Sequence, residues 1–90
     1  MTVLCQVFKS SRKEEMYLYV EKSRGLVDVP QELMQRFGEP LAVMTLMLTS
    51  THKLARANPE EVLDGIITQG FYLQMPPTAA QLLRRDGSAE

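Results

Sequence analysis

Cysteine and histidine are almost absent from this 90-residue sequence, and their scarcity excludes several kinds of site. One cysteine and one histidine, Cys5 and His52, cannot supply the ligands of a zinc site, and no run of carboxylates has EF-hand spacing. The five glycines are scattered, so no glycine-rich loop is available to hold a phosphate group. We therefore expect no metal and no cofactor.

Long apolar runs are missing as well. No window approaches the roughly 18 uninterrupted apolar residues of a membrane span. The first residues lack the positive charge and apolar stretch of a signal peptide. Cys5 has no second cysteine with which to form an internal disulfide, which is typical of proteins from a reducing compartment. The expected location is the cytoplasm, with no membrane contact.

Neither sign of charge dominates the chain. Ten Lys and Arg against eleven Asp and Glu leave a net charge of −1, which argues against a dedicated DNA-binding domain and sequence-specific DNA binding. The two signs are unevenly spread, however. Residues 1–56 contain eight basic and six acidic side chains, whereas residues 57–90 contain two basic and five acidic ones.

The apolar content suffices for one domain, which we place at residues 1–85, followed by a disordered tail at 86–90. Residues 2–8 and 16–20 have the composition and alternation of a strand pair joined by a polar loop, and residues 71–75 alternate again.

Residues 41–48 form the most apolar stretch, which fits either a buried helix or a buried strand. The flanking Pro40 and the polar residues 49–51 favour a central strand.

Helix signals separate these strands. Three helices are expected to begin near Pro30, Asn58 and Thr78, where a proline or a capping residue suits the first turn. Gly38 and Gly70 are placed to end the first two helices.

The predicted order is therefore β-β-α-β-α-β-α, an α/β fold. If the first strand lies between the second and third, the strand order is 2-1-3-4 in a four-stranded mixed sheet. Right-handed crossovers then put the first two helices on one face, and the third helix covers the other, giving an α/β/α sandwich. The residues expected to be almost fully buried are Val7, Leu18, Val43, Leu46, Val62, Ile66 and Leu73.

Five segments together resemble the YcgL domain family of proteobacterial proteins. They are KSSRK (9–13), YLYVEK (17–22), VPQELM (29–34), FGEP (37–40) and QGFYLQMPP (69–77). The resemblance runs from about residue 3 to about residue 83. It implies an α/β/α sandwich with a small sheet, and it assigns no activity, cofactor or catalytic residue to this chain.

No catalytic combination emerges from the residues. Cys5 falls on an apolar strand face, so we interpret it as a small buried hydrophobe and do not expect a Cys5–His52 dyad. The paired carboxylates at 14–15 and 60–61 suit a solvated loop and a helix start. Enzymatic activity is therefore not expected.

The methionines and the tyrosines each allow two interpretations. Met44 and Met47 are typical of a hydrophobic groove, but core filling is the commoner role and is the one we predict. Tyr17 and Tyr19 suit either stacking on bases or packing under a helix, and packing is again the commoner role.

The basic residues in the loops are the one feature of the sequence that indicates a function. In the predicted topology Lys22 and Arg24 follow the second strand and lie at the same end of the sheet as His52, Lys53 and Arg56, which follow the third. Such a cluster suits a phosphate backbone or an acidic protein. The sequence thus predicts a non-enzymatic module that binds a macromolecule, either protein or RNA. The alternative is a small enzyme, or a subunit whose site is completed by a partner.

Overall fold

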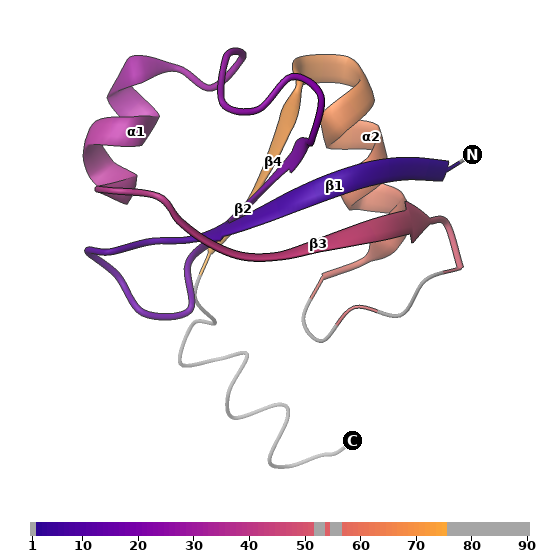
Figure 1. Cartoon of the computed structure of the whole chain (residues 1–90), viewed down its shortest axis with the longest axis horizontal. Helices are drawn as coiled ribbons and strands as arrows, with labels where there is room; N and C mark the ends of the chain where they lie inside the picture. The colour runs from indigo at the N-terminus through magenta and orange to yellow at the C-terminus, as the bar shows by residue number, and fades with distance from the viewer. Residues whose placement is uncertain (1, 52–53, 55–56, 76–90) are drawn as a thin grey trace, which may run out of the picture.

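The computed structural model describes residues 2–51, 54 and 57–75. Within them, four strands and two helices follow in the predicted order (Figure 1): β1 (Thr2–Lys9), β2 (Tyr17–Glu21), α1 (Gln31–Phe37), β3 (Leu41–Thr49), α2 (Pro59–Gln69) and β4 (Phe71–Gln74). The third helix expected from Thr78, and the tail at 86–90, lie outside the described residues.

The four strands form one sheet in the order β3-β1-β2-β4, with every neighbouring pair antiparallel. The α/β class, the four-stranded sheet and the place of β1 between β2 and β3 are confirmed. Two details of the predicted topology are corrected. The sheet is antiparallel rather than mixed, and β4 pairs with β2 rather than with β3.

The position of β4 follows from the way α2 ends beside the turn after β2. In that turn the Arg24 guanidinium donates two hydrogen bonds to the Asp28 carboxylate, over 2.6 and 2.9 Å. Gly70 ends α2 with a φ of 92°, and a Cβ built on it would lie 2.5 Å from the Cβ of Asp28. The chain therefore leaves α2 at the end of β2, where Phe71 pairs with Val20.

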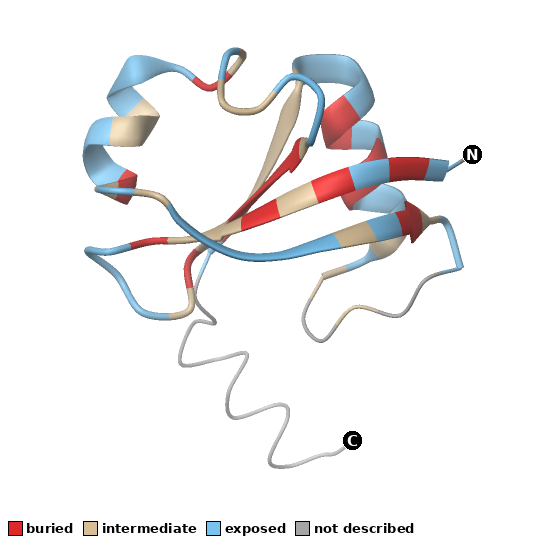
Figure 2. Ribbon diagram, in the orientation of Figure 1, coloured by how far each residue is buried: buried red, intermediate tan, exposed pale blue. Residues whose placement is uncertain are grey.

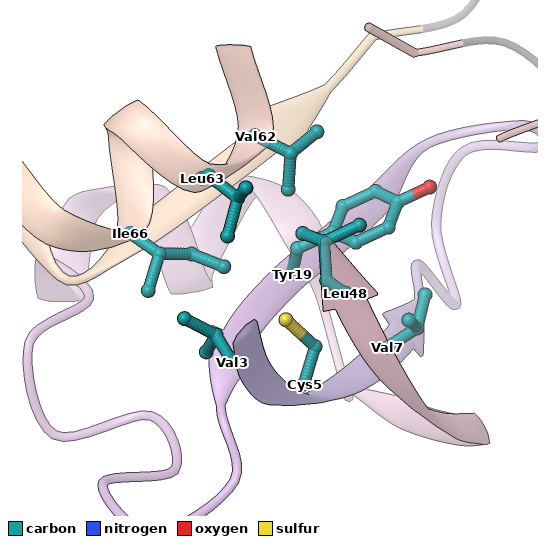
Figure 3. Close-up of a cluster of buried hydrophobic side chains, with 8 residues drawn as sticks. All are labelled: Val3, Cys5, Val7, Tyr19, Leu48, Val62, Leu63 and Ile66. Atoms are coloured by element: carbon teal, nitrogen blue, oxygen red, sulfur yellow. The ribbon is translucent and has the colours of Figure 1, made fainter. Parts of the chain in front are cut away.

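The helix α2 covers one face of the sheet. Asn58 accepts a hydrogen bond from the backbone N–H of Glu60, which satisfies one of the unpaired donors in the first turn, as the sequence predicted. The helix buries Val62, Leu63 and Ile66 against side chains of three strands (Figure 3). This cluster contains Val3, Cys5, Val7, Tyr19, Leu48, Val62, Leu63 and Ile66.

The helix α1 and the turn before it cover part of the opposite face. Leu18 and Val20 point away from Tyr19 and pack in a second cluster that contains Met16, Leu18, Val20, Val29 and Phe37. The buried hydroxyl of Ser10 joins the loop after β1 to the end of α1. It donates to the Phe37 carbonyl oxygen and accepts from the backbone N–H groups of Arg12 and Lys13.

The two described helices therefore lie on opposite faces, which gives the described part of the chain an α/β/α layering. The expectation that both lie on one face is wrong because the crossover rule applies to connections between parallel strands. β2 and β3 both run antiparallel to β1 and so share a direction, but β4 runs against them. The connection through α2 thus falls outside the rule.

The predicted core is confirmed at four positions and corrected at three. Val7, Leu18, Val62 and Ile66 are buried. Val43 is 46% exposed, and Leu46 and Leu73 are only partly buried. Two of these three lie on β3, which the sequence placed at the centre of the sheet and the structure places at its edge. An edge strand has one neighbour instead of two, so its side chains have fewer partners.

Candidate functional site

The predicted basic site is only partly described by the structure. Lys22 and Arg24 follow β2, as expected, whereas His52, Lys53 and Arg56 lie outside the described residues. β2 and β3 do run in the same direction, since both are antiparallel to β1. Glu21 lies opposite Cys5 and Thr49 opposite Thr2, so both strands end toward the start of β1.

Arg24 has a structural partner. Its bidentate contact with Asp28 holds the turn between β2 and α1, and the hydrogen bond from Arg24 lowers the pKa of the Asp28 carboxyl. A guanidinium that already holds a carboxylate attracts an external phosphate less strongly than an unpaired one. Of the two described members of the predicted cluster, exposed Lys22 is therefore the better suited to bind an anion.

A pocket of about 530 Å³ lies beside this ion pair, between the start of β1, the end of β2 and the end of α2. Its charged lining consists of Glu21, Arg24 and Asp28, and its apolar lining includes Leu4 and Ile67. Since Arg24 and Asp28 neutralise each other, the charge left on the lining is that of the Glu21 carboxylate, which does not suit an anionic ligand. Within the described part of the chain, no group of three His, Cys, Asp or Glu side chains could hold a metal ion.

Cys5 is enclosed between β2 and β3, its strand neighbours, and shows no exposed surface. Burial, with a smaller contribution from the nearby Glu21 carboxylate, raises the pKa of its thiol to about 11. A protonated and enclosed thiol is a poor nucleophile. This agrees with the interpretation of Cys5 as a core residue.

The tyrosines also have packing roles. The Tyr19 and Tyr72 rings meet edge to face, with centroids 6.1 Å apart, and the Tyr19 hydroxyl donates to the side-chain oxygen of Gln74. Tyr17 packs against the cluster under α2. Tyr19 is buried, and Tyr17 and Tyr72 are partly buried against the same cluster, so packing is the role that the structure shows for these rings. Among the described residues, no helix is long and apolar enough to cross a membrane.

The most unusual surface is formed by β3 and the adjacent part of β1 (Figure 2). β3 is the longest strand, contains no charged residue, and buries only Leu48. We call the exposed side chains here the β3 surface. They retain between 42% and 56% of their accessible area, and they are Leu4, Leu41, Val43, Met44 and Met47.

The two sides of β3 are open for different reasons. Leu4 and Met47 are paired across β1 and β3 on the α1 side of the sheet, and the cluster under α1 includes neither of them. Met44 pairs with Val7 on the α2 side, where Val7 is buried but Met44 is 53% exposed. Among the described residues, neither helix covers β3 along its length, and side chains on both of its faces are exposed.

Local polar contacts keep the strand in register while leaving it exposed. The Gln6 side-chain amide donates to the Met44 carbonyl oxygen over 2.8 Å, and the Thr45 hydroxyl donates to the Gln6 side-chain oxygen over 3.0 Å. These contacts hold β3 to β1 without burying it. Val43 lies at a bulge, because Val7 pairs with Met44 and Phe8 with Ala42.

Sequence reasoning missed the β3 surface because it took the apolar run as core. The signal was nevertheless present in Met44 and Met47, since methionine is favoured at adaptable binding surfaces as well as in cores. The core interpretation of both is wrong, because they are 53% and 56% exposed.

Comparison with known proteins shows one family over most of the chain. The model of the YcgL domain matches residues 5–77. A YcgL domain-containing protein of Chromohalobacter salexigens is 54% identical over 80 residues, which cover 89% of this chain and 83% of that protein. Relatives from Hahella chejuensis and Pseudomonas paraeruginosa are each 51% identical, over 82% and 86% of this chain and 70% and 79% of their own lengths.

Proposed function

The chain belongs to the YcgL domain family, and we propose that it is a non-enzymatic module that binds another protein through the β3 surface. One observation carries the proposal. The longest strand of the sheet is uncharged and lies at an edge, with four of its large apolar side chains about half exposed.

An open edge of this kind has a recognised use. Among the described strands β3 pairs with β1 alone, so its outer backbone N–H and C=O groups are placed to pair with an extended segment of another protein, and the side chains on either face then select the segment. Proteins usually protect such edges with lysine, proline or inward-pointing charges. β3 carries none of these residues, although it does have the bulge at Val43. An uncharged apolar edge favours a protein ligand over a polyanion.

RNA is the competing partner, and its contacts would come from Lys22, Arg24, His52, Lys53 and Arg56. The observation that weighs against it is the engagement of Arg24 by Asp28. The two ligands differ in their dependence on salt. Affinity for a phosphate backbone falls steeply with salt concentration, whereas affinity for an apolar strand changes little.

Photo-crosslinking in living cells tests the proposal. A photoreactive amino acid in place of Met47 is expected to give protein adducts that survive nuclease treatment. The matched control places the same group at Thr68, which is also exposed but lies on α2. Adducts at position 47 and not at 68 support the proposal.

Two results would contradict it. Equal labelling at positions 47 and 68 would mean that the β3 surface has no special affinity for protein. Adducts obtained from a probe at Lys22 alone, and lost on nuclease treatment, would favour RNA bound by the basic loop.

A further inference from the structure

Resting on the proposed function, we propose that the protein bound by the β3 surface is a second copy of this chain, joined edge to edge through two antiparallel β3 strands. The contact turns two four-stranded sheets into one sheet of eight strands. The symmetric arrangement is a two-fold dimer in which each copy uses the same residues.

Symmetry limits the register of this pairing. The two-fold axis of a continuous antiparallel sheet is perpendicular to the sheet, so it keeps each side chain on its own face. Residues directly opposite each other must therefore both be even-numbered or both be odd-numbered along the regular part of the strand. That part begins after the bulge, because Met44 to Thr49 pair without interruption with Val7 to Thr2. An axis through Leu46 makes the fullest use of residues 44–48.

With this register the strand is complementary to itself. Leu46 lies opposite its own copy, Met44 lies opposite Leu48, and Thr45 lies opposite Met47. On the α1 side, the exposed Met47 side chain of each copy thus gains a neighbour from the other copy. The same register places the two Thr45 side chains diagonally across the interface, within the roughly 7–8 Å at which such neighbours interact.

Charge imposes no penalty on this contact. β3 contains no charged side chain, and the whole chain has a net charge of −1, so two copies repel each other only weakly. The pairing of two β3 strands therefore brings no like charges of these strands together. An acidic or basic segment from another protein finds no opposite charge on β3 itself.

The dimer is expected to be weak. A standard stable interface buries about 800 Å² on each partner, and a short strand pairing with a few half-exposed side chains falls below that area. Association in the micromolar range or weaker follows, with dimers accumulating from about 10 µM to about 1 mM.

Sedimentation velocity of the full-length chain across that concentration range tests the proposal. Thr45→Lys and Thr45→Glu each place like charges across the interface and are expected to weaken self-association about fivefold or more. An equimolar mixture of the two variants pairs Lys with Glu, so it is expected to restore dimers. Thr68→Lys, an exposed threonine on α2 given the same charge, is the control and is expected to dimerise as the wild type does.

Other outcomes separate this proposal from the proposed function. A wild-type chain that stays monomeric at about 1 mM overturns the dimer, and position-specific crosslinks to a different protein would leave the protein-binding function in place. A second outcome also rejects the dimer for the wild type. If the wild type is monomeric and the double variant with Leu82→Asp and Leu83→Asp dimerises, the segment beyond Met75 of the same chain occupies the β3 surface in the wild type. A mixture of the Lys and Glu variants that stays as monomeric as either alone would show that dimers, if present, form elsewhere.

Discussion

β2 and β3 show opposite relations between composition and burial. β2 contains two tyrosines and a glutamate in only five residues, yet its three central residues are buried. β3 has nine residues without a charge, yet only one is buried. The difference lies in their surroundings. In the described part of the chain, β2 has a strand on each side and packs into clusters with both helices, whereas β3 has β1 alone as a strand neighbour. Position in the sheet, rather than hydrophobicity, decides which strand becomes core.

The strongest test of this difference is truncation at the centre of β2. Leu18 is fully buried between α1 and the sheet, so Leu18→Ala removes buried methyl groups and leaves a cavity. The expected loss in the free energy of unfolding is about 2–5 kcal/mol, measured by urea denaturation. A loss below about 1 kcal/mol would place Leu18 in a site that collapses freely, and the cluster under α1 would then be loosely packed.

The next effect concerns the polar contact that holds α1 over β2. Ser10→Ala removes the donor to the Phe37 carbonyl oxygen and the acceptor for two backbone N–H groups. Ser10 and Phe37 are both buried. The expected cost is about 1–3 kcal/mol, because buried groups lose their partners. Faster amide exchange in α1 than in α2 would locate the damage on that side.

Ser23→Ala provides the matched control. Its hydroxyl also donates a hydrogen bond, to the Glu21 carboxylate, but that contact is exposed to water. A change within about 0.5 kcal/mol is expected. Equal losses for the two serines would contradict a special role for the buried one.

The contrast between β2 and β3 also shows how far the sequence determines this fold. The residues that begin and end the two described helices were predicted correctly, because these signals depend only on neighbouring residues. Asn58 caps α2, and Gly38 and Gly70 adopt positive φ at the helix ends. The alternation of Leu18 and Val20 with Tyr17 and Tyr19 predicted β2 correctly, although both faces proved to be covered.

The place of β3 could not be predicted in the same way. It depends on where β4 pairs, and β4 pairs with β2 at the point where Gly70 lies close to Asp28, a residue far from it in the sequence. Nothing in the run 41–48 itself distinguishes an apolar strand covered by helices from one exposed at the edge of the sheet. Of the candidate basic site, the direction shared by β2 and β3 was predictable from topology, whereas the pairing of Arg24 with Asp28 was not foreseen.

A smaller effect is expected from Cys5, which lies between β2 and β3 and is buried by both neighbours. Its thiol has a pKa of about 11 in the folded chain against 9.0 for an ordinary cysteine. The unfolded chain therefore ionises first, and the stabilisation is complete below pH 9.0 and lost as the pH rises toward about 11. About 1 kcal/mol is expected to be lost between roughly pH 7 and pH 10.

Urea denaturation at a series of pH values checks this, with Cys5→Ala as the comparison. The pKa values of Tyr19 and Tyr72 are also raised, so these tyrosines contribute to the pH dependence of stability in both proteins. The variant lacks only the thiol, so the difference between the two stability curves gives the contribution of Cys5. Parallel curves between pH 9 and 11 would show that the Cys5 thiol ionises as readily in the folded chain as in the unfolded one.

The smallest effect is expected on β3 itself. Met47 is 56% exposed in the longest and most apolar strand, so Met47→Gln exchanges an apolar side chain for a polar one of similar length without emptying a cavity. For the monomer, studied at concentrations well below those at which dimers form, the free energy of unfolding should change by no more than about 0.5 kcal/mol. The same substitution should weaken self-association and reduce crosslinking through the β3 surface, because the proposed interface buries this side chain. A stability loss comparable to that of Leu18→Ala would mean that Met47 is covered in the free monomer. In that case β2 and β3 would differ in composition but not in burial, and the β3 surface would not be available to a partner.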